Sequence, residues 1–473
     1  MSADELSFVI PTYRLRDVGE TVKHYDEHLR RNGHAPAIVV CDDPSPAAVE
    51  KYYPLLEQTS THCDLYYVGP REKERFIAFL RGRLRDKRLD GLEKNPFRPS
   101  YGGNRNFTLM HTLGGLRSPP TTTCTLIVRC NTAARRSNAG EISRGRLHRT
   151  GEGEPTRKSF AIFGAFLDVL DKRAEDVPEN YDRGELLVDT AMDLETNATK
   201  GLARENSLLL EGDAIPGDAV VKMAQTFRSG TNGIDAADFA DLFLEDEGQV
   251  DPDGLNEQCV LVNYRPVVTK KNWRMDCGVA GYDNTFGLPP FFPTRLRFED
   301  YIYRLWVQQP GIASAHVDAS QNHTRSNYMR NPVAAELFNE EVSNLLKTKI
   351  KGSVSRVDEV GIAFDYDGRV AAEDAGAILE KVSAVHARAV DAAGRAMRAD
   401  RKEALRLFAA NLEKAFYSFG PDSFHQNLLR IVDDVVTIIK GSIELWPTLI
   451  EICYFEKDRR GLPRIRVDNP RLG

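Results

Sequence analysis

Three short apolar runs alternate with helix-like stretches at the beginning of the chain, and this order constrains the fold more than any other feature. The runs cover residues 8–10, 37–41 and 65–68. The stretch at 21–31, between the first two runs, carries apolar residues at helical spacing. Buried strands that alternate with helices favour a parallel sheet covered by helices, so the beginning of the chain predicts an α/β fold.

The chain after residue 330 has a different pattern. Apolar residues recur there at intervals of three and four over 405–416 and 428–439, which is the period of a helix with one buried face. The pattern predicts helix almost throughout this segment. We therefore expect two domains, an α/β domain over residues 1–330 and a helical C-terminal domain over residues 331–473.

Composition narrows the classes of partner. The formal net charge of -6 argues against a nucleic-acid or membrane surface as the partner, and no run reaches the roughly 18 apolar residues of a membrane span. The acidic N-terminus lacks an apolar leader segment. The seven cysteines form no Cys-x-x-Cys pair, which argues against structural zinc or a disulfide framework. We expect a cytoplasmic protein without a membrane span, and a homo-oligomer stays open.

Two motifs close the first two apolar runs. They are Pro11-Thr12-Tyr13 and Asp42-Asp43. Parallel sheets bind nucleotides outside the carboxyl ends of their strands. Asp42 or Asp43 could accept a hydrogen bond from uracil or ribose at that edge. A helix cap or a turn is the structural alternative for the two acids.

Two further motifs lie beside predicted helices. Gly103-Asn104-Arg105-Asn106 precedes a helix expected at 107–112, and Arg297-Phe298-Glu299-Asp300 opens one expected at 299–308. Gly103 would let the backbone approach a ligand closely, and Arg105 could pair with a phosphate. Asp300 could accept a proton from a hydroxyl group. The structural alternatives are a salt bridge for Arg105 and favourable placement of Glu299 and Asp300 in a first helical turn.

In their order and spacing, the four motifs resemble those of family-2-type glycosyltransferases with a GT-A fold, over roughly the first 325 residues. The resemblance implies a Rossmann-like sheet that binds a nucleoside-diphosphate sugar and a transfer of the sugar to a hydroxyl acceptor. It places the nucleotide beside Pro11, Tyr13, Asp42, Asp43, Gly103 and Arg105. It makes Glu299 and Asp300 the catalytic motif, with Asp300 as the base of an inverting enzyme.

The resemblance also implies a divalent cation, Mg²⁺ or Mn²⁺, at the diphosphate. Glycosyltransferases of this fold often take a metal ligand from a late histidine. His323, in an expected polar loop beside Arg325, is the preferred candidate over His316, which is expected to end a strand. Arg325 would hold the diphosphate. A surface or capping role is the alternative for the histidine.

The acidic metal ligands of the family are missing where the resemblance expects them. The corresponding place, 116–124, contains no acid. Its residues Ser-Pro-Pro-Thr-Thr-Thr-Cys are also what an apolar–Ser–Ala–Asp–Asp–Asp–Met sequence can give when the same bases are read in another frame. We therefore hypothesise that about residues 116–140 are a frame-shifted translation. A true variant without the metal site and an arginine-rich disordered insertion are the alternatives.

Other functions stay open at this point. The phenylalanine-rich loop at 286–292, with Trp273, could form an acceptor wall, and packing between domains is its alternative. A nucleotidyltransferase uses a similar sheet, but it would place glycines directly after the first strand, where this chain has none until Gly19. A non-catalytic protein that binds a nucleotide or a partner is the third hypothesis.

Overall fold

The computed structural model describes the chain in stretches that include a central sheet and the C-terminal helices. Among these residues, no helix combines the length and the apolar character needed to cross a membrane. The described residues are 7–12, 15–31, 35–42, 54–59, 61–84, 91–113, 124–128, 173, 185–189, 218–230, 244, 258–262, 267–268, 279–294, 296, 299–307, 309, 312–323, 334–358, 360–418, 421–460, 462 and 465–466.

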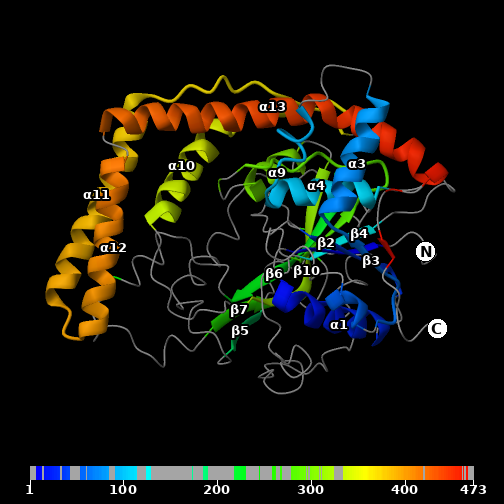
Figure 1. Cartoon of the computed structure of the whole chain (residues 1–473), viewed down its shortest axis with the longest axis horizontal. Coiled ribbons are helices and arrows are strands. Elements are labelled where there is room, and N and C mark those ends of the chain that lie inside the picture. The colour runs from blue at the N-terminus through cyan, green and yellow to red at the C-terminus, as the bar shows by residue number, and fades with distance from the viewer. Residues whose placement is uncertain are drawn as a thin grey trace.

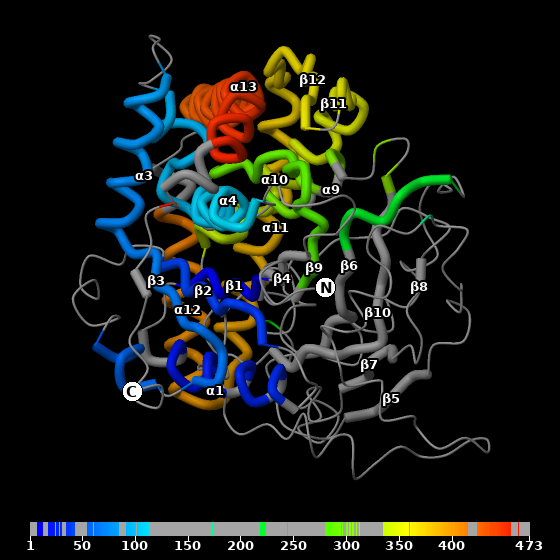
Figure 2. The backbone as a smooth tube through the Cα atoms, turned by 90° about the vertical axis from the view of Figure 1, so that its right-hand side faces the viewer, coloured from blue at the N-terminus to red at the C-terminus, as the bar shows by residue number. Residues whose placement is uncertain are grey.

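A mixed sheet of nine strands forms the centre of the described structure (Figure 2), in the order β13-β3-β2-β1-β4-β9-β6-β10-β8. Strands β3, β2, β1 and β4 are parallel, and β9 runs antiparallel to β4 and β6. The chain is therefore α/β, as predicted. The strands are β1 Ser7–Thr12, β2 Ala37–Asp42, β3 Leu65–Val68, β4 Cys124–Val128, β6 Val220–Gly230, β8 Val267–Val268, β9 Val279–Asp283, β10 Ile312–His323 and β13 Ile465–Arg466.

Strands β1, β2 and β3 coincide with the three apolar runs. Phe8 pairs with Ile38, and Ile38 with Leu65, so the three runs lie side by side in one register. All three side chains are buried, as expected for parallel strands that are covered on both faces. The helix after β1, α1 (Leu15–Arg31), begins six residues before the stretch in which its apolar spacing was recognised.

Helices α3 (Pro70–Arg83) and α4 (Tyr101–His111) begin at recognisable caps. The Glu72 carboxylate accepts a hydrogen bond of 3.1 Å from the amide of Gly69, just before α3. The Ser100 hydroxyl accepts one of 3.1 Å from the amide of Gly103. Because of this cap, α4 begins six residues before the predicted helix, and the Gly-Asn-Arg-Asn motif lies inside the helix rather than before it.

The C-terminal segment is mainly helical, and α13 runs along one side of the molecule (Figure 1). Between α10 and α11 lies a small hairpin of β11 (Val354–Arg356) and β12 (Ile362–Phe364). A further two-stranded sheet pairs β5 (Glu185–Asp189) with β7 (Gln258–Val262). The C-terminal helices are α10 Ala334–Ile350, α11 Ala372–Arg395, α12 Ala399–Ser418 and α13 Pro421–Arg460.

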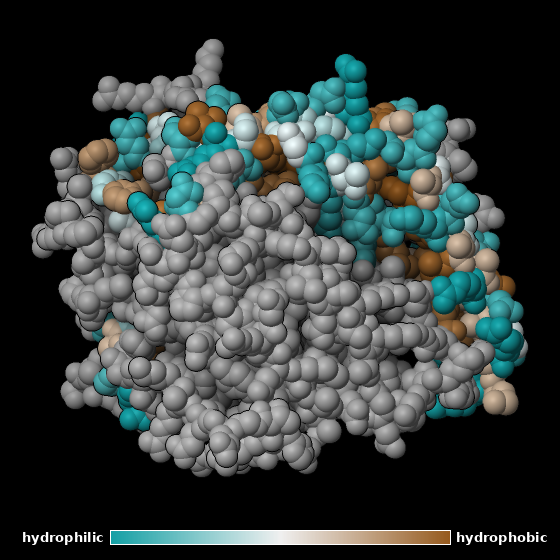
Figure 3. Space-filling view, turned by 180° about the vertical axis from the view of Figure 1, so that it is seen from behind, coloured by the Kyte–Doolittle hydropathy of each residue, from teal (hydrophilic) through white to brown (hydrophobic). Residues whose placement is uncertain are grey.

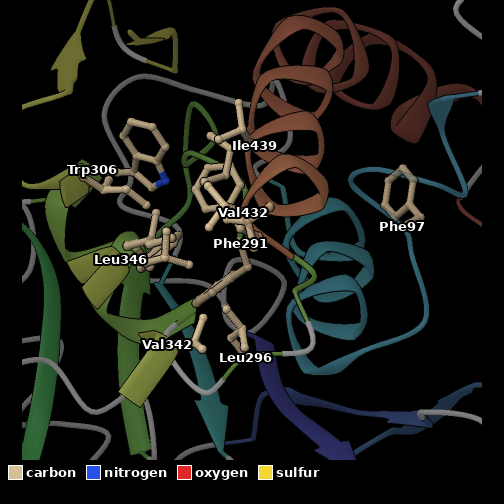
Figure 4. Close-up of a cluster of buried hydrophobic side chains, with 14 of the residues drawn as sticks. Phe97, Phe291, Leu296, Trp306, Val342, Leu346, Val432 and Ile439 are labelled. Carbon is tan, nitrogen blue, oxygen red and sulfur yellow. The ribbon is translucent and has the colours of Figure 1, made fainter. Parts of the chain in front are cut away.

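These helices share one core with the sheet region. The indole nitrogen of Trp446, in α13, donates a hydrogen bond of 2.5 Å to the carbonyl of Leu288, and Arg98 pairs with Asp434 at 2.9 Å. Strand β13 continues the sheet beyond β3. A single cluster of buried side chains (Figure 4) includes Phe97, Phe291, Leu296, Trp306, Val342, Leu346, Val432 and Ile439.

Two local predictions differ from the structure. His323 is the last residue of β10, not part of a polar loop, and His316 lies within this strand rather than at its end. The physical reason is that β10 pairs with β6 as far as His323, so the backbone there is held in a ladder. Strand β4 lies inside the suspected frame-shifted segment 116–140, whose remaining residues are outside the described part.

Candidate functional site

Three consecutive polar residues of α4 contact three different parts of the molecule. They are Asn104, Arg105 and Asn106, and all three are buried. Successive residues of a helix point about 100° apart, so one turn of α4 can join the sheet, α9 (Glu299–Val307) and the loop before α9. The first turns of α4 therefore connect the parts of the candidate site.

Asn104 joins α4 to the carboxyl end of β2 and to α3. Its amide nitrogen donates to the carbonyl of Cys41 at 3.0 Å. Its amide oxygen accepts from the ammonium group of Lys73 at 2.7 Å and from the thiol of Cys41 at 3.1 Å. The Asn104 side chain thus uses both its donor and its acceptor to fix the end of the strand.

Asp42 ends β2 within this network and is buried. The Tyr67 hydroxyl donates a hydrogen bond of 3.0 Å to its carboxylate, and Lys73 donates to its main-chain carbonyl. The Lys73 ammonium group also lies 5.1 Å from the centre of the Phe107 ring. A buried acid and a buried cation therefore lie in one cluster, which limits the cost of taking either charge out of water.

Arg105 points to a different side of α4 from Asn104, toward α9. Its guanidinium group pairs with the carboxylate of Asp300 and lies 4.9 Å from the centre of the Phe291 ring. Only 2% of the Arg105 side chain is exposed, compared with 19% of Asp300. The salt bridge considered as the structural alternative for Arg105 is thus present, and its partner is the predicted catalytic base.

Asn106 holds the loop that leads from β9 to α9. Its side chain donates to the carbonyl of Phe291 at 2.7 Å and accepts from the amide of Phe291 at 2.7 Å. It also donates to the carbonyl of Pro96 at 2.6 Å. This two-way contact with one residue fixes the loop directly beside Arg105 and Asp300.

Gly103 is needed for packing within the chain. A side-chain carbon at this position would lie 1.9 Å from the carbonyl oxygen of Arg98, and one at Gly102 would lie 2.6 Å from that of Phe292. The close approach expected between Gly103 and a ligand is therefore made by the chain's own backbone. A nucleotide contact at Gly103 remains a prediction.

The aromatic loop at 286–292 is mainly part of the core. Phe291 stacks on Tyr303 with ring centres 3.8 Å apart, and Phe292 packs at 5.0 Å from Trp306. Both phenylalanines are fully buried, whereas Phe286 is 61% exposed. The packing alternative therefore applies to Phe291 and Phe292, and only Phe286 could meet an acceptor. Trp273 is outside the described residues.

The structure describes only some of the other predicted residues. Pro11 lies in β1 one residue before its end, and Glu299 is buried at the start of α9. Tyr13, Asp43 and Arg325 lie outside the described residues. Of His323, the structure describes only the backbone. Within the described part of the chain, no three histidine, cysteine, aspartate or glutamate residues gather as a metal site requires.

Sequence reasoning missed Tyr67 and Lys73, which both contact Asp42. Tyr67 lies in the third apolar run, where its hydroxyl group was read as part of a buried strand. Lys73 lies one turn into a charged helix. A lysine on the first turn after a parallel strand is placed at the nucleotide edge of the sheet, and this position was the signal that could have identified it.

Comparisons with protein-family models, with curated proteins and with solved structures give no match for this chain.

Proposed function

We propose that the chain is a glycosyltransferase that moves a sugar from a nucleoside-diphosphate sugar to a hydroxyl acceptor, on a GT-A type fold. One observation carries the proposal. Asp42, from the carboxyl end of β2, and Asp300, from the start of α9, both lie beside the first two turns of α4. A nucleotide-binding acid and a base would thus flank one helix at the ligand-binding edge of parallel strands.

In this proposal, Asp42 accepts a hydrogen bond from the base or ribose of the donor. Tyr67 and Lys73 hold the end of β2 before the donor arrives, through the carboxylate and the main-chain carbonyl of Asp42. A site that is already ordered loses less conformational entropy when it binds. These two residues therefore act as positioning residues for Asp42.

Asp300 takes the proton of the acceptor hydroxyl group as that oxygen attacks the anomeric carbon of the sugar. The bond from that carbon to the diphosphate breaks, and the nucleoside diphosphate leaves. The partial exposure of Asp300 gives an acceptor access from one side, while Arg105 fixes the carboxylate from the other. Because the Arg105 guanidinium group is paired with Asp300, it can reach a diphosphate only if this ion pair opens. We therefore assign Arg105 to the positioning of Asp300 rather than to the diphosphate.

The divalent cation of the family is not assigned to this chain. The described residues do not fit it, because no group of three suitable ligands exists among them. His323 and the segment around 121–123 remain the positions to test. The triple variant Thr121→Asp, Thr122→Asp, Thr123→Asp introduces the acids that the other reading frame can encode.

The test measures equilibrium binding of UDP and GDP, and release of nucleoside diphosphate from UDP-glucose, UDP-N-acetylglucosamine and GDP-mannose. We expect Asp42→Asn to weaken binding about tenfold, through loss of one charge-assisted hydrogen bond. Asp300→Asn should keep binding and lose turnover. The matched control is Asp433→Asn, an exposed site on α13, which should change neither.

Other outcomes point to the rival functions. Nucleotide binding without turnover, in both the chain as printed and the triple aspartate variant, would support a non-catalytic nucleotide-binding protein. Release of pyrophosphate from a nucleoside triphosphate and a sugar phosphate would support a nucleotidyltransferase. The proposal is wrong if neither form binds any of these nucleotides.

A further inference from the structure

The hairpin of α11 and α12 extends away from the sheet at one end of the molecule (Figure 1). Its turn comprises residues 396–398, between Arg395 and Ala399. The inner faces of the two helices are apolar and packed, with Val382, Ala389, Leu405 and Leu412 buried. The hairpin is therefore a packed projection, and its outer side chains include the exposed Val390 and Met397.

Exposed apolar side chains concentrate on this hairpin. Six large hydrophobic residues of the described part are exposed, and three of them, Val390, Met397 and Leu407, lie within 18 consecutive residues. Met397, in the turn itself, is 90% exposed and is the most exposed of the six. Single exposed apolar residues are ordinary, but Met397 lies at the turn of a projection, and two other exposed apolar residues lie on the same hairpin, which indicates a contact surface.

The part of the hairpin nearest its turn carries a positive charge, unlike the chain as a whole. Residues 388–407 carry six basic and three acidic side chains, a net charge of +3, whereas the whole chain carries -6. Seen from behind, the hairpin lies at the right-hand edge, where hydrophilic and hydrophobic atoms alternate (Figure 3). The basic residues are Arg388, Arg395, Arg398, Arg401, Lys402 and Arg406, and the acidic ones are Asp391, Asp400 and Glu403.

Ion pairs hold two of the arginines beside the turn. Arg395 pairs with Asp391 at 3.0 Å, and Arg398 pairs with Asp400 at 2.6 Å. All four side chains are more than half exposed, so the pairs order the guanidinium groups without removing them from the surface. Met397 is thus flanked on both sides by a basic group at a known position.

We propose that the turn of this hairpin docks on the surface of an anionic lipid bilayer. Met397 enters the boundary between headgroups and acyl chains, and the basic residues contact the lipid phosphates and carboxylates. Apolar and basic side chains both strengthen interfacial binding, since it scales with the buried apolar area and with the attraction of basic groups to anionic lipids. The shape of the hairpin also agrees with this partner. A projecting turn can insert into a deformable lipid surface, whereas a folded protein would need a groove that matches the turn. The proposal does not depend on glycosyl transfer.

The test is co-sedimentation of the full chain with vesicles of phosphatidylcholine alone, or with 30% phosphatidylserine added. We expect binding to the anionic vesicles only. Binding should weaken as the salt concentration rises from about 0.1 M to 1 M, because the Debye length falls from about 10 Å to 3 Å. Met397→Asp and the double variant Arg395→Glu, Arg398→Glu should each lower the partition coefficient at least about tenfold.

Matched controls change the same chemistry elsewhere. Val357→Asp alters an apolar residue that is 68% exposed on the β11–β12 hairpin, and Lys23→Glu with Arg369→Glu reverses two exposed basic residues. Both should keep vesicle binding. The proposal is overturned if the chain does not co-sediment with anionic vesicles, or if the control variants weaken binding as much as the hairpin variants do. A dimer that Met397→Asp dissociates, without vesicle binding, would assign the surface to a second copy.

Discussion

The region around α4 and the C-terminal helices are stabilised in different ways. Around α4, buried polar side chains join parts of the chain that are distant in sequence, as Arg105 joins Asp300 and Asn106 joins Phe291. In the C-terminal helices, apolar side chains such as Leu405 and Val432 repeat at helical spacing and pack on neighbouring helices. The hydrogen bonds around α4 require particular atoms at particular positions, whereas apolar packing between helices requires only that their faces fit together. The region around α4 should therefore tolerate much less change.

The largest expected effect compares two glycines in helices. Gly103→Ala should lower the free energy of unfolding by about 3 kcal/mol, because the added carbon would overlap the carbonyl of Arg98. Gly376→Ala, in α11, meets no atom within 4 Å. It should raise the free energy of unfolding by roughly 0.5–1 kcal/mol, since alanine favours helix. Urea unfolding measures both, and similar effects at the two sites would break the comparison.

A smaller effect is expected for two asparagines. Asn106→Ala should cost about 2 kcal/mol, because it leaves buried backbone groups of Phe291 and Pro96 without their hydrogen bonds. Asn411→Ala, at an exposed position of α12, should change stability by less than about 0.5 kcal/mol. The test compares the midpoint temperature of thermal unfolding of each variant with that of the unchanged chain. If Asn411→Ala proved as costly as Asn106→Ala, polar contacts would matter equally in both regions.

The smallest effect concerns a polar group in the helical region. Burial, with the negative charges of Asp367 and Asp374, raises the pKa of Tyr366 to about 12. Because the folded chain holds this proton more tightly than the unfolded chain, the stabilisation is present below pH 10 and is lost as pH rises from about 10 to 12. Tyr366→Phe should therefore lose less stability over this range than the unchanged chain. Unfolding curves at pH 9, 10 and 11 test this, and parallel losses in both chains would contradict it.

The elements of regular pattern could be predicted from the sequence. The three apolar runs became β1, β2 and β3, and the stripes at 405–416 and 428–439 lie in α12 and α13. These predictions succeeded because the spacing of apolar residues shows which face of a helix or strand is buried, and this spacing can be seen within a short stretch of sequence. The start of α4 was placed too late, since two glycines weaken the helical pattern that Ser100 nevertheless caps.

The candidate site could be predicted only in part. Asp42, Arg105 and Asp300 were identified, but their mutual placement was not, because hydrogen bonds between distant residues leave no periodic trace. Lys73 was hidden among the other charged residues of α3, and its burial became visible only from the packing of α3 on β2 and α4. The basic hairpin was hidden in the same way, since the acidic average of the whole chain conceals a local excess of arginine.

The position of β13 has a consequence for the order in which the protein is made. Ile465 pairs with Tyr67, so the edge of the sheet beside β3 is completed by a strand that is synthesised roughly 400 residues after β3. At about 5–20 residues per second, β3 waits roughly 20–80 s for this partner. During that time, the edge that carries Tyr67 has an open ladder of backbone groups, the kind of edge that pairs with other chains. The interval between the synthesis of β3 and that of β13 is therefore the period in which this edge can pair with another chain.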